Sequence, residues 1–194
     1  MTRTEFIKAH ALAATLASLG SPIFPETLLT QSIVESNNGN SSLSRDYNNF
    51  FGIKAGSTWK GKSVNKRTRE VFNGRSTYIN DNFRVYNSYF ASARDAIRFY
   101  KTYSRYRFVT DSQDVEQQLR YIGMSGYATA PNYTTVLLSV YRANKDTMEK
   151  YIRRSRVFYY GAFLSTSLAA FYIIDPVRFR QKFGAVKGYL KRKL

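Results

Sequence analysis

Residues 30–61, TQSIVESNNGNSSLSRDYNNFFGIKAGSTWKG, form the stretch that decides the fold. Just upstream, apolar residues recur at helical spacing over residues 25–34, so a helix with one face packed into a core is predicted there. This helix ends at a single acid, Glu35. Polar turn-forming residues follow, and then an aromatic, glycine-punctuated segment at residues 48–54. The pattern indicates a helix, an acid at its end and a loop able to form the wall of a cleft.

Glu35 is the candidate general acid. It lies near the C-terminal end of the predicted helix, where the helix dipole disfavours a negative charge. A carboxyl in that place beside apolar neighbours is predicted to have a pKa above its ordinary value. A general acid that works near neutral pH requires such a raised pKa.

A set of short motifs surrounds Glu35. They are Gln31, Glu35-Ser36, Gly39, Ser41, Asn48-Asn49-Phe50-Phe51-Gly52-Ile53-Lys54 and Trp59-Lys60-Gly61. In this order and spacing they resemble the glucosaminidase family of peptidoglycan hydrolases, which includes flagellar rod-cap enzymes and bacterial autolysins. Asn38 departs from the pattern, because the family usually has an aromatic residue there. The resemblance implies a mainly α (α+β), lysozyme-like helical domain with a small β-hairpin lobe.

Residues 64–86 are predicted to form that hairpin, because Asn73-Gly74 is a strong turn signal between two strand-like segments. From spacing alone, Glu70 is as much an ion-pair partner in a basic hairpin as a catalytic carboxylate. The resemblance favours the catalytic role, with Asp81 as a weaker candidate for it. The family's Thr-x-Glu and Phe-Arg-x-Tyr motifs match Thr68-Arg69-Glu70 and Phe83-Arg84-Val85-Tyr86.

Helices are also predicted around this central part. Residues 4–19 are predicted to form the first helix of the domain rather than a secretory signal, since charged residues interrupt the apolar run. His10 on this helix is interpreted as structural or exposed. A second helix is predicted over residues 89–104, with Phe90, Ala93, Ile97 and Tyr100 on its apolar face.

Two more helices are predicted in the second half, over residues 111–124 and 132–151, with Thr110 or Asp111 as the N-cap of the former. Between them, residues 126–133 (GYATAPNY) resemble the family's Gly-Tyr-Ala-Thr-Asp-Pro-x-Tyr, with Ala130 in place of the usual Asp. The resemblance implies that Tyr127 reaches into the active site and holds substrate or water.

The resemblance also implies the reaction, which is cleavage of the β-1,4 bond after N-acetylglucosamine in the glycan strands of peptidoglycan. Glu35 is then the acid and Glu70 the second carboxylate, and attack by the acetamido group of the substrate is a third route. Phe51, Trp59, Asn49 and Ser36 are the candidate substrate-binding residues, although core packing is an alternative for the aromatic ones.

Composition limits the classes of function. The formal net charge is +17, from 30 Lys and Arg against 13 Asp and Glu, which favours an anionic polymer or surface as partner. The chain has no Cys and a single His, which excludes disulfides, a thiolate metal site, a histidine zinc site and a Ser-His-Asp triad. No metal or other cofactor is expected.

The last part of the chain has a different composition, which predicts a hydrolase domain at residues 1–150 and a basic tail at 151–194. Residues 157–174 form an uncharged run of 18 residues, at the lower limit for a membrane-spanning helix. A buried helix is the alternative, and the aromatic residues near the ends of the run favour the membrane. The basic segment after the run suits an anionic membrane surface, with nucleic acid as a weaker alternative partner.

Without a recognisable signal peptide, a phage virion or the bacterial cell envelope is the expected location, with virion assembly proteins as further partners.

Two other functions compete with glucosaminidase hydrolysis. One is a lytic transglycosylase, which needs only one glutamate. The other is a non-catalytic structural or wall-binding virion protein that retains the fold.

Overall fold

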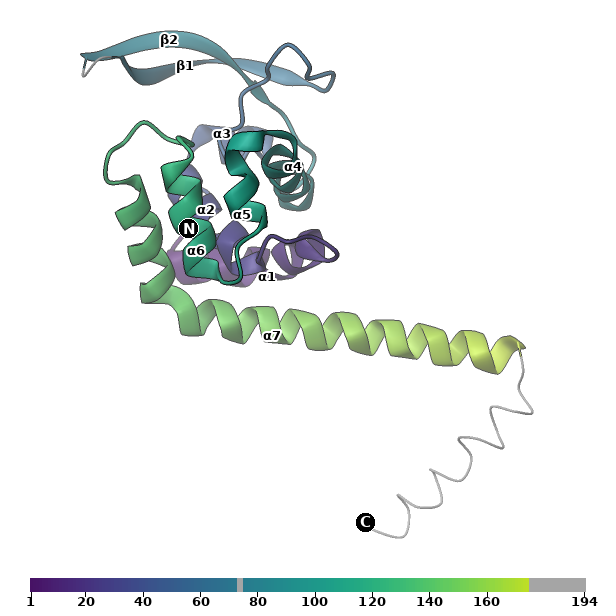
Figure 1. The fold of residues 1–194 in the computed structure, drawn as a ribbon. Coiled ribbons are helices and arrows are strands. Elements are labelled where there is room, and N and C mark those ends of the chain that lie inside the picture. The colour runs from purple at the N-terminus through teal and green to yellow at the C-terminus, as the bar shows by residue number, and fades with distance from the viewer. Residues whose placement is uncertain (73–74, 175–194) are drawn as a thin grey trace. The chain divides into compact units, whose positions relative to one another are not determined.

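The computed structural model describes residues 1–72 and 75–174, with side chains except at 69–72, 75–76 and 163–174. The described elements, in chain order, are α1 (Arg3–Ser18), α2 (Pro25–Ser36), α3 (Ser42–Tyr47), β1 (Ser63–Phe72), β2 (Arg75–Arg84), α4 (Tyr89–Thr102), the 3-10 helix η1 (Ser104–Tyr106), α5 (Arg107–Thr110), α6 (Val115–Met124) and α7 (Tyr133–Ile174). Helices and one antiparallel hairpin make up this fold, which confirms the predicted mainly α class (Figure 1).

Helix α1 packs against α2 and α4. The Thr2 hydroxyl accepts the backbone N–H of Glu5, and the Glu5 carboxylate accepts the N–H of Thr2, so two N–H groups at the helix start are satisfied. The buried apolar face of the helix consists of Phe6, Ile7, Ala11, Ala14 and Ala17. The prediction that residues 4–19 form a helix of the folded domain is therefore confirmed.

His10 on α1 is part of the packing against α4. Its ring stacks on Tyr89, with 4.4 Å between the ring centroids, and it meets the edges of two phenylalanine rings. Burial lowers the pKa of His10 to about 4, so the imidazole is neutral over the physiological range. The structural interpretation of His10 is the one that the fold supports.

The hairpin pairs Ser63 with Arg84 at its base and Phe72 with Arg75 at its tip. This register confirms the predicted hairpin, and the predicted Asn73-Gly74 turn lies outside the described residues. At the base, the backbone of residues 53–55 bonds to β2, through Arg84 N to Ile53 O at 3.0 Å and Ala55 N to Asn82 O at 2.6 Å. The loop after α3 thereby joins the hairpin to the helices.

Helix α4 has a buried face that differs from the predicted one at a single position. Ala93, Ile97 and Tyr100 are buried as expected, but Phe90 is 42% exposed. Tyr89 takes the inward position instead, because residues 89, 93, 96 and 100 follow the helical repeat more closely than residue 90 does.

The predicted helix over 111–124 is shorter than expected. It begins at Val115, after Asp114, whose carboxylate accepts the backbone N–H of Gln117 at 2.8 Å. Asp114 is therefore the N-cap, and the prediction of Thr110 or Asp111 is wrong. Thr110 instead ends the short helix α5.

Helix α7 starts at Tyr133 and continues past the predicted end at residue 151 to Ile174. Within Met1–Arg153, the first of two compact units into which the chain divides, α7 contributes Leu137, Leu138, Met148 and Ile152 to the core. The second unit is Arg154–Leu194.

The membrane-spanning helix predicted over residues 157–174 is not borne out. No helix among the described residues has both the length and the apolar character needed to cross a membrane. The predicted membrane-binding segment at 175–194 and the side chains of 163–174 lie outside the described residues.

Candidate active site

Glu35 lies in the last turn of α2, which ends at Ser36 and is followed by Asn37 in the left-handed conformation, with φ of 50°. The inward face of α2 consists of Leu28, Leu29 and Ile33. This face anchors the helix, and Glu35 follows at the edge of the core, where its side chain is half-buried. The hydroxyl of Tyr133, at the start of α7, donates a hydrogen bond to Glu35 Oε1.

Burial raises the pKa of Glu35 from its ordinary value of 4.5 to about 7. The bond from Tyr133 acts in the opposite direction, because a donor stabilises the charged carboxylate, but burial is the larger effect. The raised pKa that the sequence predicted is therefore found, with desolvation as its main cause. At neutral pH a substantial fraction of Glu35 is protonated and able to act as an acid.

Behind Glu35, a row of buried polar groups supports Tyr133. Gln31 lies one helical turn before Glu35 on the same face of α2, and its Nε2 donates to the Tyr133 hydroxyl oxygen at 3.5 Å. Gln31 Oε1 in turn accepts a hydrogen bond from the hydroxyl of Tyr100 on α4. Gln31 thus connects three elements, α2, α4 and α7, behind the carboxyl.

Tyr127 stands next to this row. Its ring lies parallel to that of Tyr133, with 6.3 Å between the centroids. Its hydroxyl donates to the backbone carbonyl of Phe51 at 2.6 Å. Tyr127 therefore holds the loop of residues 48–54 in place beside Glu35, and this bond already engages its hydroxyl proton.

The loop approaches Glu35 most closely at Gly52. The residue has a φ of +63°, and a Cβ atom added there would lie 3.6 Å from Glu35 Oε2. Glycine suits this backbone because it adopts positive φ without the steric cost that other residues incur. The family-like Phe-Gly-Ile segment thus forms one wall beside the carboxyl.

Three of the predicted substrate-binding residues have supporting positions instead. Ser36 is fully buried, and its hydroxyl bonds to the backbone of Ser32 and Gly39. Asn49 is 1% exposed, and its amide bonds to the backbone of Ile53 and Arg84. The ring of Phe51 is fully buried in the core. These predictions are corrected, because a buried side chain in the folded protein has no surface left for a glycan.

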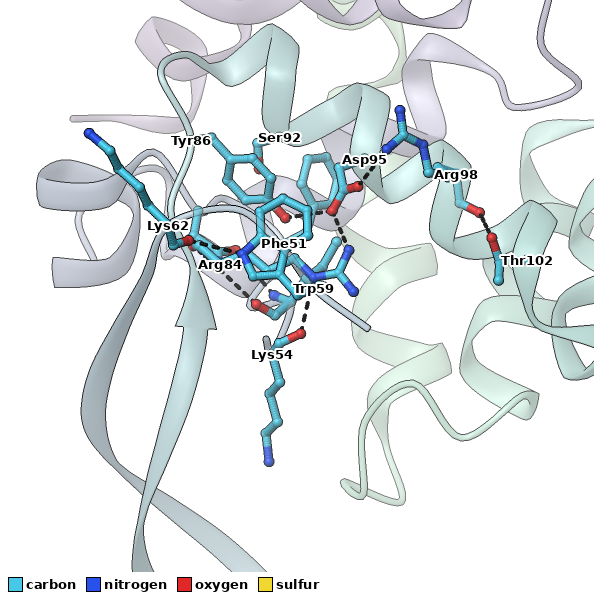
Figure 2. A network of polar contacts seen from close by, with 12 residues as sticks. Phe51, Lys54, Trp59, Lys62, Arg84, Tyr86, Ser92, Asp95, Arg98 and Thr102 are labelled. Atoms are coloured by element: carbon cyan, nitrogen blue, oxygen red, sulfur yellow. Dashed lines mark hydrogen bonds and ion pairs between the residues drawn. The ribbon is translucent and has the colours of Figure 1, made fainter. Parts of the chain in front are cut away.

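Trp59 is the predicted substrate-binding residue with an accessible position. Its indole N–H donates to Lys62 O at 3.0 Å, and the guanidinium carbon of Arg84 lies 4.5 Å from the centre of its ring. Arg84 forms a buried ion pair with Asp95 of α4, at 2.6 Å, and Tyr86 donates to the same Asp95 oxygen at 2.8 Å (Figure 2). Trp59 lines a cleft next to this network.

The structure describes the backbone of the second candidate carboxylate but not its side chain. Glu70 lies on β1, paired with Thr77 on β2, and its side chain lies outside the described ones. Its catalytic role stays a prediction. The weaker candidate, Asp81, forms an ion pair with Lys54 at 2.9 Å, and it accepts the backbone N–H of Asn82.

Sequence reasoning assigned no role to Tyr133, the residue that contacts Glu35 directly. Tyr133 was visible as the last residue of the GYATAPNY segment, and Gln31 as the first of the motifs around Glu35. Their pairing was not visible, because Glu35 and Tyr133 are 98 residues apart in the sequence. Only the packing of α2 against the start of α7 brings them together.

A proton-holding glutamate at the end of a buried helix, beside a small hairpin lobe, places the domain among the lysozyme-like glycoside hydrolases. Comparison with known families narrows this class. The family described as mannosyl-glycoprotein endo-beta-N-acetylglucosaminidase matches residues 11–146. The chain therefore belongs to the glucosaminidase family, as the motifs around Glu35 predicted.

Individual relatives agree with this assignment. The peptidoglycan hydrolase FlgJ of Salmonella typhimurium is 33% identical over 150 residues, covering 75% of this chain and 48% of the relative. The solved glycoside hydrolase domain of the same FlgJ has a TM-score of 0.60 at 32% identity and covers 75% of this chain and 99% of that domain. A peptidoglycan hydrolase mutant from Sphingomonas sp. A1 has a TM-score of 0.67 at 30% identity, with 78% and 99% covered. The chain spans about half the length of the curated FlgJ relative.

Proposed function

We propose that this glycoside hydrolase cleaves peptidoglycan at the β-1,4 bond between N-acetylglucosamine and N-acetylmuramic acid. The observation that carries the proposal is the half-buried Glu35, which has a pKa of about 7 and accepts a hydrogen bond from Tyr133. Membership of the glucosaminidase family supplies the class of bond. The net charge of +17 favours an anionic wall polymer as the substrate.

Glu35 acts as the general acid in this proposal. In its protonated form it transfers its proton to the glycosidic oxygen as the bond to the anomeric carbon breaks. The carboxylate that remains accepts the hydrogen bond from Tyr133, which stabilises the negative charge that appears there. Tyr133 and Gln31 also hold the carboxyl in one orientation, because both belong to the buried row behind it.

The second group completes the reaction. We assign it to Glu70 on β1, which either attacks the anomeric carbon or activates a water molecule. Attack by the acetamido group of the substrate is the other route. Comparing Glu70→Gln with the wild-type chain separates them, because Glu70→Gln loses activity only where the carboxylate takes part.

The test of the main proposal is the release of reducing ends from purified peptidoglycan by the full chain. The wild type is expected to release them, and Glu35→Gln to lose at least about a hundredfold in rate, the lower range for general acid catalysis. Glu149→Gln is the matched control, because it makes the same change at an exposed carboxyl on α7 that pairs only loosely with Lys145 at 3.9 Å. Full activity of Glu35→Gln would overturn the assignment of the acid.

Mass spectrometry of the products identifies the bond and the reaction. Ends with reducing N-acetylglucosamine are expected. Anhydro-muramyl ends would indicate a lytic transglycosylase instead. No released ends with any variant, together with binding to the wall, would indicate a non-catalytic wall-binding protein.

We further propose that the protein works at the bacterial cell envelope or from a phage virion. The proposed substrate and the positive net charge support this location. Immunodetection in purified virions and in envelope fractions tests it, and recovery of the protein from neither would contradict it.

A further inference from the structure

A cleft of about 160 Å³ opens between α4 and the segment that precedes the hairpin. Its walls carry both aromatic and charged side chains. Trp59 comes from the segment before β1, Arg84 from the end of β2, and Asp95, Arg98, Phe99 and Tyr103 from α4 and the residue after it. Aromatic faces together with hydrogen-bonding groups are typical of pockets that take a polar ligand with some apolar surface.

The charges in this cleft do not cancel. Asp95 Oδ2 is engaged by Arg84 at 2.6 Å and by the Tyr86 hydroxyl at 2.8 Å, so Arg84 is neutralised in place. Arg98 is left over. Among the described residues its guanidinium pairs only with Asp95 Oδ1, at 3.9 Å, and its side chain is 77% exposed (Figure 2). A positive charge with free donors thus stands at the mouth of the cleft, which suits a carboxylate.

A row of packed aromatic rings runs from the wall of the cleft to Glu35. The ring of Phe99 lies 6.1 Å, between centroids, from that of Tyr127. Tyr127 in turn lies against Tyr133, which bonds to Glu35. The loop of residues 48–59 runs beside both places, since Gly52 approaches Glu35 and Trp59 lines the cleft. The same loop thus borders both the cleft and the residue proposed as the acid.

We propose that this cleft is a binding site for a carboxylate-bearing N-acetylated amino sugar of the glycan strand, with Arg98 as the residue that recognises the carboxylate. Trp59 and Tyr103 supply apolar surface for the sugar, and Arg98 selects the acidic sugar over its neutral neighbour. This inference rests on the proposed function and deepens it, because it assigns which sugar of the repeating unit occupies the cleft. The carboxylate has two sources in peptidoglycan, the lactyl group of muramic acid and the peptide stem attached to it.

The test is a binding titration with the full-length Glu35→Gln chain, which keeps the glycan uncut. Three soluble tetrasaccharides of alternating N-acetylglucosamine and N-acetylmuramic acid serve as probes: one with free lactyl carboxyls, one with the lactyl carboxyls converted to amides, and one with stem peptides. The chain is expected to bind a carboxylate-bearing probe about threefold more tightly than the amide probe, the effect of a partly exposed charge pair. Tighter binding of the free lactyl probe assigns the lactyl source, and tighter binding of the stem-peptide probe alone assigns the stem.

The deciding comparison adds Arg98→Gln to the Glu35→Gln chain. Arg98 is exposed, so its loss leaves the core intact, and the preference for the carboxylate is expected to disappear. Lys101→Gln is the matched control, because Lys101 is an exposed cation on the same helix that does not line the cleft, and the preference is expected to remain. Equal binding of all probes, or a preference that survives Arg98→Gln, would overturn the proposal. Failure of the proposed function is distinguishable, since it appears as a wild-type chain that releases no reducing ends while the binding preference persists.

Discussion

At the scale of single residues, two opposing influences set the protonation of Glu35, on which the proposed chemistry depends. Burial favours the protonated acid, and the hydroxyl of Tyr133 favours the carboxylate. Burial dominates, so the pKa settles at about 7, within the range where a carboxyl both holds and releases a proton at neutral pH. The helix dipole alone would produce a smaller effect, because a charge at a helix end typically changes the free energy by only about 0.3–1 kcal/mol.

Tyr133→Phe tests this balance. Removal of the hydroxyl takes away a donor to the charged form, so the pKa of Glu35 is expected to rise further above 7. The alkaline side of the kcat/KM profile should then move to higher pH, by up to about one pH unit. The kcat at the optimum should fall roughly tenfold, because the carboxyl loses the group that orients it.

The control for Tyr133→Phe is Tyr89→Phe, which removes another buried hydroxyl bonded to α2, through Ser32 at 3.0 Å. Its pH profile is expected to match the wild type. An unshifted profile for Tyr133→Phe would mean that the hydroxyl has no influence on the protonation of Glu35.

At the scale of elements, the carboxylate of Asp95 adds a buried side-chain attachment between the hairpin lobe and the helices. Asp95 on α4 accepts hydrogen bonds from Arg84 at the end of β2 and from Tyr86 just after it. Asp95 and Arg84 are 6% and 9% exposed, so the ion pair is largely shielded from water. A two-stranded hairpin is marginally stable by itself in water, which makes this attachment important for its position.

Asp95→Asn is expected to lower the free energy of unfolding by about 3 kcal/mol, because it leaves the buried guanidinium of Arg84 without a compensating charge. Chemical denaturation measures this change. Asp46→Asn is the matched control, since Asp46 is half-exposed and pairs with Arg45 at only 3.9 Å, and its change is expected to stay below about 1 kcal/mol. Equal stability of the two variants would show that the ion pair does not hold the hairpin.

At the scale of the whole molecule, the active site lowers the stability of the fold at neutral pH. The pKa of Glu35 is 4.5 when exposed and about 7 in the folded protein, so the folded state binds the proton more tightly. The stability contribution of Glu35 is therefore fully present below pH 4.5 and is lost as the pH rises through 7. The loss is on the order of 3 kcal/mol.

Glu35→Gln removes this dependence, because an amide has no proton to lose. The stability of Glu35→Gln minus that of the wild type is expected to grow by on the order of 3 kcal/mol between pH 4 and pH 8. Thermal unfolding of both chains at several pH values gives the difference between their free energies of unfolding. The titration of all other groups is common to both chains and cancels in this difference. A difference that stays constant with pH would contradict the raised pKa.

Several features of the fold could be predicted from the sequence because their causes are local. The apolar residues of 4–19 repeat at helical spacing, and the Asn-Gly sequence signal lies between the two strands that pair as a hairpin. The start of α6 was missed, because Thr110, Asp111 and Asp114 are all acceptable N-caps by residue type. The raised pKa of Glu35 could be predicted from its place beside apolar neighbours at the helix end, while the buried positions of Ser36, Asn49 and Phe51 could not.

The sequence by itself determined the family, the main helices and the candidate acid Glu35, because each of these is encoded in neighbouring residues and their spacing. Only the tertiary structure decided that Tyr133 contacts Glu35, that Asp95 joins α4 to the hairpin and that Arg98 faces a cleft. The physical reason is that the burial of a side chain, and its hydrogen-bond or ion-pair partners, depend on which surfaces meet in the core. Helical periodicity specifies that a face is buried, but the packing of the elements selects its partner.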